Sequence, residues 1–298
     1  MKKSIIVVSM AAVLLLLVAS CKKENSTSKV VLRAGIEDTP SKTHVDITGP
    51  WTNWKDTDHI MVNGNKMYLS KKYEGRPGVF DHADFTCDNW TGHDPDGSIQ
   101  LYAVSPATQQ RPGTNANTYE SLISLPAVQP YIKNGFMDDL PMAVSNKGKS
   151  LNFSNLTCIL GVPVRTAQQG LTITKVELTC ADSQYPLVAQ AWWPHWGQES
   201  LDLNAIQIDP MSSASWTITL DCGEGVTIPT DDEGIEFYFA AFPVLPKDSK
   251  LDIKFYVNKN DAEPVATIHK TLSGKTEPSV IYDLVSKPDL NDRTPWTI

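Results

Sequence analysis

The sequence lacks the short motifs that mark common enzyme classes. It has no Gly-x-Ser-x-Gly nucleophile turn, no His-Glu-x-x-His metal-binding pair and no glycine-rich phosphate loop. Its six histidines are scattered, without Cys or Asp partners in the order of a catalytic triad. Triad residues converge in space rather than in sequence, so this absence alone does not exclude catalysis. Because nothing in the chain supports catalysis, we expect that the protein is not an enzyme.

Positive charge is also in short supply. The 298 residues include 26 Lys and Arg against 34 Asp and Glu, which gives a net charge of −8. An acidic chain is not attracted to nucleic acid or to anionic membrane surfaces. Neither is therefore an expected partner.

Cysteine pairs with the CxxC spacing of a zinc site are absent, so we expect no metal and no other cofactor. The segment from Asp81 to Asp84 could ligate a metal, but an ordinary polar segment is the favoured interpretation. Four cysteines follow Cys21. An oxidising compartment would allow disulfides among these four, in three possible full pairings. Buried free thiols are the alternative. These cysteines are Cys87, Cys158, Cys180 and Cys222.

The N-terminus has the form of a bacterial export signal. Two lysines are followed by an almost wholly apolar segment, which ends in Val18-Ala19-Ser20-Cys21. This segment is shorter than the ~20 residues that a membrane-spanning helix needs. We predict a signal peptide over residues 1–20, removed at a lipobox, and lipid attachment to Cys21. A plain signal peptide or a short anchor is the alternative. The polar residues 21–29 are predicted to form a lipidated, flexible tether.

After Cys21 no segment keeps a helical periodicity over three turns, and no hydrophobic run could span a membrane. Short segments rich in Val, Ile and Thr alternate with polar residues and are separated by turn residues. Removal of residues 1–20 leaves 278 of the 298 residues, enough for two domains. We predict an all-β fold of two β-sandwiches, over residues 30–145 and 146–298.

Several local patterns make sharper predictions. Asn63-Gly64 between apolar segments predicts a hairpin. The alternation that starts at Leu151 changes phase near Ser154-Asn155, which predicts a bulge or a turn there. Residues 237–242 are apolar throughout and predict a strand buried on both faces. Residues 107–117 are rich in Gln, Asn, Pro and Gly and predict an exposed loop.

The densest aromatic cluster comprises Trp192, Trp193 and Trp196 around His195. Exposed indole rings stack on sugar faces, so these residues are candidates for glycan contact. The alternative is that they cap the core or contact a neighbouring domain, as amphipathic aromatic residues often do.

Five short segments follow one another in a recognisable order: Trp54, Asp58–Val62, Asp139–Ala143, Leu151–Leu156 and Phe239–Pro243. This order resembles the fimbrillin family of Bacteroidota lipoproteins. That family shows a Trp near a GD-x-I-x-V segment, then a D-x-M-x-A segment and a strand of the form F-x-H/N-L. This chain departs from the pattern at Thr57, where the family usually has Gly, and at Asn155, where His is common. The set covers nearly the whole chain after the tether.

The resemblance implies two transthyretin-like β-sandwich domains and a lipid-anchored pilus (fimbrium) subunit or adhesion protein at the bacterial outer membrane. The implied partners are other pilus subunits, joined by β-strand addition, and surface ligands or glycans. Stalk subunits of the family lose an N-terminal segment to an arginine-specific protease, and the Arg33–Ala34 bond is the candidate site. An ordinary strand arginine is the alternative. Residues 289–298 alternate poorly as a donor strand, so we predict an anchor, tip or accessory subunit rather than a bulk stalk subunit. A glycan-binding surface lipoprotein is the alternative function.

Overall fold

The computed structural model describes residues 28–36, 54–75, 77, 80–92, 95–106, 109–112, 119–133, 135–180, 186–195, 209–230 and 234–284. Every regular element in these residues is a strand, which confirms the all-β prediction. None of them lies in a helix that could cross a membrane. The strands are β1 (Ser28–Ile36), β2 (His59–Val62), β3 (Asn65–Tyr73), β4 (His82–Trp90), β5 (Gln100–Ser105), β6 (Gln109–Pro112), β7 (Tyr119–Ser124), β8 (Val128–Pro130), β9 (Met142–Lys147), β10 (Ser150–Asn155), β11 (Cys158–Val164), β12 (Thr172–Thr179), β13 (Val188–His195), β14 (Asp209–Ser215), β15 (Thr217–Thr227), β16 (Ile235–Ala241), β17 (Lys250–Tyr256), β18 (Ala266–Thr271) and β19 (Ile281–Asp283).

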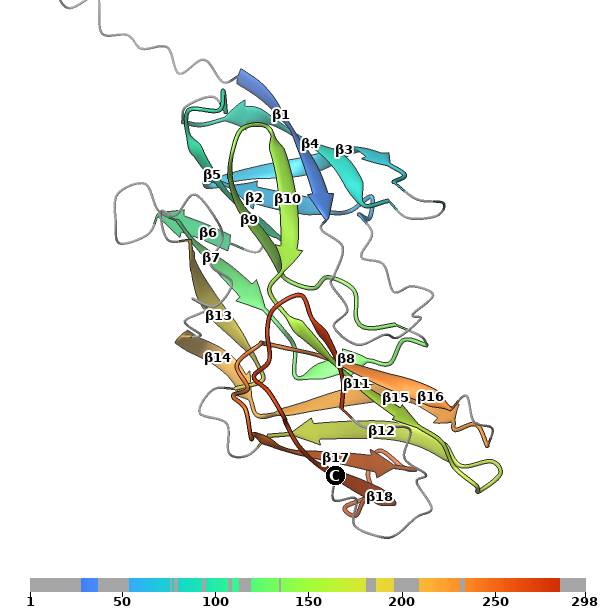
Figure 1. Cartoon of the computed structure of the whole chain (residues 1–298). Coiled ribbons are helices and arrows are strands. Elements are labelled where there is room, and N and C mark those ends of the chain that lie inside the picture. The colour runs from blue at the N-terminus through green and yellow to red at the C-terminus, as the bar shows by residue number, and fades with distance from the viewer. Residues whose placement is uncertain are drawn as a thin grey trace, which may run out of the picture.

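Seven strands close into a barrel in the order β1-β10-β9-β5-β2-β3-β4, at the top of Figure 1. The ring closes because β1 pairs with two neighbours, in parallel with β10 and antiparallel with β4. Trp54 is 1% exposed and meets Phe85 and Phe153 edge-on, with ring centroids 4.9 and 5.6 Å away. These aromatic contacts form the centre of the barrel's core. Closure leaves this body without a sheet edge.

The Asn63-Gly64 hairpin is confirmed. Val62 pairs with Asn65, and the two turn residues have φ of 47° and 80°. Two positive φ angles in succession are typical of a type I′ turn, which favours Asn-Gly. The same turn contacts the next sheet, because the Gly64 N–H donates to Gln110 Oε1 at 2.6 Å.

The predicted change in the apolar alternation near Ser154-Asn155 falls where the chain leaves the barrel and enters a second body. β10 ends at Asn155 in the barrel, and β11 begins at Cys158 in another sheet. Leu156 and Thr157 make this connection and are both buried. The Leu156 N–H donates to the Pro141 carbonyl at 2.8 Å, so the connection is itself held by the backbone.

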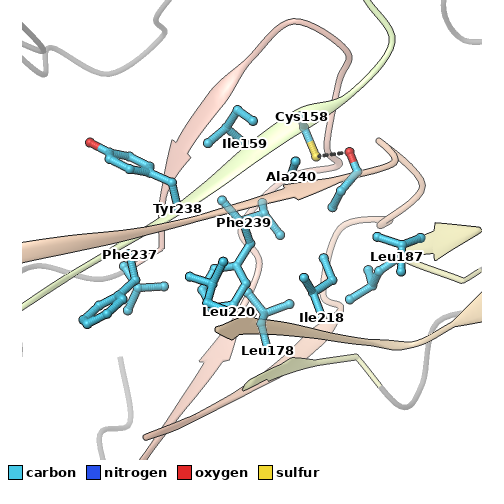
Figure 2. Close-up of a cluster of buried hydrophobic side chains, with 14 of the residues drawn as sticks. Cys158, Ile159, Leu178, Leu187, Ile218, Leu220, Phe237, Tyr238, Phe239 and Ala240 are labelled. Atoms are coloured by element: carbon cyan, nitrogen blue, oxygen red, sulfur yellow. Dashed lines mark hydrogen bonds between the residues drawn. The ribbon is translucent and has the colours of Figure 1, made fainter. Parts of the chain in front are cut away.

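Two sheets face one another in the second body, one ordered β16-β11-β19 and the other β18-β17-β12-β15-β8. Figure 2 shows Phe237 and Phe239 of β16 pointing toward Leu178 of β12 and Leu220 of β15, while Tyr238 points to the opposite face. All three aromatic residues are buried, so β16 is covered on both faces as predicted. Phe237 also meets Phe255 of β17 edge-on at 5.9 Å, which links the two sheets.

A third sheet, ordered β14-β13-β7-β6, extends between these bodies in Figure 1. Its edge strand β6 corrects the prediction of a loop over residues 107–117, because Gln109–Pro112 pairs antiparallel with β7. These residues have little intrinsic preference for strands. They are held instead by the neighbouring strand and by the contact from Gln110 to the β2–β3 turn.

All four described cysteines are buried and free, which confirms the interpretation as buried thiols. The Cys158 thiol donates to the Ala241 carbonyl at 3.5 Å, the dashed line in Figure 2. Burial raises the pKa of the Cys158 and Cys222 thiols to about 12. Such thiols remain protonated and unreactive at neutral pH.

The strand pairing crosses the predicted division at residues 145 and 146. β10 follows that division but belongs to the barrel, and β7 precedes it but pairs with β13. Pairing does not show whether either segment folds on its own, so the domain division remains a prediction. The transthyretin-like topology also remains a prediction.

Candidate functional site

The candidate protease bond, Arg33–Ala34, lies in the middle of β1. Arg33 is opposite Ser150 of β10 on one side and Asp84 of β4 on the other. Its N–H donates to the Lys149 carbonyl at 2.9 Å. Ala34 is fully buried. Both sides of this peptide bond are therefore engaged in the wall of a closed barrel.

The Arg33 side chain is held on the outer surface of the barrel by two neighbouring strands. Its Nε donates to Asp84 Oδ1 at 2.9 Å, and its Nη2 donates to Oδ2 at 3.3 Å. The guanidinium carbon lies 4.5 Å from the centre of the Tyr73 ring. The Tyr73 hydroxyl in turn donates to Asp84 Oδ2 at 2.6 Å. We call Arg33, Tyr73 and Asp84 the β1 latch.

The hydrogen bonds of the latch favour the ionised form of Asp84. The hydrogen bond from Arg33 is the main cause that lowers the pKa of Asp84, and the hydrogen bond from Tyr73 acts in the same direction. Asp84 therefore stays ionised at neutral pH and keeps both carboxylate oxygens occupied. In the segment of residues 81–84, Asp84 binds Arg33, and Asp81 Oδ1 lies 2.6 Å from His82 Nδ1. Among the residues that the structure describes, no group of three or more His, Cys, Asp or Glu side chains is placed to hold a metal ion.

Access of a protease to this bond requires β1 to leave the barrel, since a protease binds its substrate as an extended, unpaired segment. Val30 and Leu32 are 6% and 0% exposed and would be transferred to water. Exposure of such side chains costs about 1.5–3 kcal/mol each, or about 3–6 kcal/mol together. That cost alone lowers the detached fraction by about two to four powers of ten. The folded barrel thus protects the bond before the latch is counted.

The aromatic candidates are only partly described. Trp192 lies on β13, between Leu122 of β7 and Asp209 of β14. The Arg111 guanidinium lies 3.9 Å from the Trp192 ring centre and is held there by Glu120, whose Oε2 accepts from Arg111 Nε at 2.6 Å. Trp192 Nε1 is buried and has no hydrogen-bond partner. The side chain of Trp193 and the whole of Trp196 lie outside the described residues, as does Cys21 with its signal peptide.

No local sequence pattern predicts the β1 latch or the contact between Arg111 and Trp192. Arg33 and Asp84 are 51 residues apart, and no local pattern connects them. Only the matching register of β1 and β4 brings them together. The composition of residues 107–117 predicts a loop, so the contact of Arg111 with Trp192 depends on the unexpected strand β6.

No protein-family model matches the chain, and no curated protein matches its sequence. Solved structures do show similarity. A protein from Bacteroides uniformis described as a "putative cell adhesion protein" is 12% identical with a TM-score of 0.41, over 85% of this chain and 90% of that one. A protein from Bacteroides ovatus with the same description is 13% identical with a TM-score of 0.43, over 87% and 92%.

A fimbrial assembly protein from Parabacteroides distasonis is 11% identical with a TM-score of 0.37, over 86% of this chain and 90% of that one. These proteins come from Bacteroidota, the group to which the sequence resemblance points. The chain is thus similar in its course to adhesion and fimbrial proteins.

Proposed function

We propose that the protein is a pilus-type or adhesion lipoprotein of the bacterial cell surface, with a structural rather than an enzymatic role. The lipobox that ends at Cys21 supports export and lipid anchorage to the outer membrane. The ordered segments shared with the fimbrillin family support a role in a fimbrium. Open sheet edges outside the barrel are compatible with joining to other pilus subunits by β-strand addition.

One observation carries the finer proposal that this is an anchor, tip or accessory subunit: the Arg33–Ala34 bond lies within a strand that is paired on both sides. A stalk subunit would lose Cys21 by cleavage at such a bond. Here the bond is protected by the barrel and by the β1 latch. The N-terminal segment is therefore retained, and Cys21 is the attachment point of the mature protein.

Mass spectrometry of the protein extracted from its native membrane tests this proposal. We expect a mature chain that begins at Cys21 and carries acyl groups. Replacement Cys21→Ser should abolish the acyl mass and leave residues 1–20 attached, whereas the matched variant Cys87→Ser should keep the processed, acylated chain. A native mature chain that begins at Ala34 would contradict the proposal.

Glycan binding is the alternative function, and Trp192 is its one described candidate residue. Arg111 lies against the Trp192 ring, so a sugar stacking on the exposed remainder would also meet a cation and the Glu120 carboxylate. Binding of the native protein to a glycan array, lost in Trp192→Ala but kept in the Trp216→Ala control, would support this alternative. Trp216 is 40% exposed in the bend between β14 and β15 and is a fair control for loss of an exposed indole. No binding by the native protein would exclude it.

A further inference from the structure

The edge strands outside the barrel differ in how well they are protected. β8 and β19 have three residues each, and β8 ends in Pro130. Proline also interrupts β6 at its end and β14 near its start, where it removes a hydrogen-bond donor. The edge of β16 is covered at Ala240, whose N–H and carbonyl both bond to the side chain of Gln129.

In the part of the chain that the structure describes, β18 is not protected by short length, by proline or by a side chain bound to its open edge. It has six residues, contains no proline and pairs with β17 without a register shift. Its sequence, Ala-Thr-Ile-His-Lys-Thr, is rich in β-branched residues, which favour extended strands. A strand of this kind at the end of a sheet is a template for another strand.

The direction of the open backbone groups follows from the ladder with β17. The Leu272 N–H donates to the Ser249 carbonyl at 2.9 Å, directly after β18. Because successive residues of a strand direct these groups to opposite sides, the groups of Ile268 and Lys270 also point toward β17. The N–H and carbonyl groups of Thr267, His269 and Thr271 therefore point away from the sheet.

We propose that β18 is a self-association edge, which pairs antiparallel with β18 of a second copy of this chain about a two-fold axis at His269. In this register His269 faces His269 of the partner subunit, and Thr267 faces Thr271 of the partner subunit. Each facing pair exchanges N–H···O bonds in both directions. The two five-stranded sheets then form one continuous sheet, and the interface is the same surface patch on both copies.

The side chains of β18 fit this arrangement. Cross-strand Thr pairs are favourable on a solvated sheet face. Lys270 falls opposite Ile268 of the partner subunit, so no lysines face each other. The two His269 rings meet at the axis, and each has a neighbouring carboxylate because Asp252 Oδ1 lies 2.6 Å from His269 Nδ1.

Sedimentation equilibrium on the unlipidated mature chain (residues 21–298 with Cys21→Ser) tests the pairing. Over about 1 μM to about 1 mM, the span of weak and intermediate affinities, we expect the weight-average mass to rise from one to two chains. His269→Pro removes an outward N–H that the β17 ladder does not use, so we expect a folded chain that stays monomeric. The matched variant His269→Thr keeps the N–H and should still dimerise. A wild-type monomer over the whole range, or an unchanged dimer of His269→Pro, would overturn the proposal.

Amide hydrogen exchange keeps the test decisive if His269→Pro fails to fold. In the wild-type chain the amides of Thr267, His269 and Thr271 should exchange more slowly as protein concentration rises. Protection that does not depend on concentration would mean that a segment of the same chain covers the edge, and would overturn self-association. This pairing needs neither the lipid nor another pilus subunit, so its failure and the failure of the proposed function are independent results.

Discussion

Gln129 is a side chain whose removal should open a sheet edge inside the folded protein. It is 1% exposed on β8, and its amide binds the backbone of Ala240 on β16 as a neighbouring strand would. Its Nε2 donates to the Ala240 carbonyl at 2.8 Å and to the Pro126 carbonyl at 3.2 Å, and its Oε1 accepts from the Ala240 N–H at 2.9 Å. The replacement Gln129→Leu keeps the approximate volume and removes all three bonds.

The expected loss follows from the groups left behind. Ala240 is fully buried, so its N–H and carbonyl would have no water to replace the amide. An unsatisfied buried polar group costs about 1–3 kcal/mol, so two of them cost about 2–6 kcal/mol. The leucine recovers part of this cost by burying apolar surface. We expect a net loss of about 3 kcal/mol in the free energy of unfolding, measured by urea denaturation.

Gln129→Glu separates hydrogen bonding from packing. An ionised carboxylate accepts from the Ala240 N–H but places its second oxygen against two carbonyls, so burial and repulsion raise its pKa above the ordinary value of about 4.3. A raised pKa in the folded state means that the folded protein binds the proton more tightly. Stability should therefore increase as pH falls from 7 toward about 4.3, relative to wild type at each pH, because the protonated acid can again donate.

Val128→Thr is the matched control, since Val128 is the preceding residue and is 61% exposed. It should change the free energy of unfolding by less than about 0.5 kcal/mol. The reasoning would be refuted if Gln129→Leu unfolded at the wild-type urea concentration. It would also be refuted if the stability of Gln129→Glu, relative to wild type, did not depend on pH.

Three further predictions concern the β1 latch and the buried thiols. Asp84→Asn should speed cleavage of the Arg33–Ala34 bond by trypsin under native conditions, measured from the mass of the fragment that begins at Ala34. The control Asp88→Asn removes an exposed ion pair with Lys29 and should not change the cleavage rate. Equal cleavage rates for the two variants would refute the role of the β1 latch. The lowered pKa of Asp84 contributes stability that is present above about pH 4 and is lost as pH falls through the folded-state value, so a urea titration should show a smaller acid loss in Asp84→Asn than in wild type. Native protein should show no alkylation of Cys158 or Cys222 by iodoacetamide at pH 8, and rapid labelling of either thiol before unfolding would contradict their burial.

The elements that could be predicted are those whose cause is local. Asn63-Gly64 specifies its own turn because both residues tolerate positive φ. The apolar run at residues 237–242 indicates burial on both faces, whichever strands lie beside it. Alternation along the chain gave the all-β class for the same reason.

The features that could not be predicted depend on partners distant in the chain. β6 has a loop-like composition and becomes a strand only because β7 lies beside it. Gln129 and Ala240 are 111 residues apart, and a lone buried Gln has no pattern that reveals its partner. The candidate site shows the same limit: Arg33 could be found as an arginine in an early strand, but Asp84 and Tyr73 could not be matched to it without the register of the barrel.

The parallel pairing of β1 with β10 has a mechanical consequence. A chain tethered through its N-terminus receives force at the start of β1, while a load on the segment that begins at β11 is transmitted along the chain to the end of β10, through the short connection between them. Since the two strands run in the same direction, these forces pull them past one another along their length. The hydrogen bonds between them are loaded together rather than broken one at a time. Such a strand pair resists pulling far better than a hairpin opened from its end. The β1–β10 pair lies between the predicted lipid anchor and the strands from β11 onward.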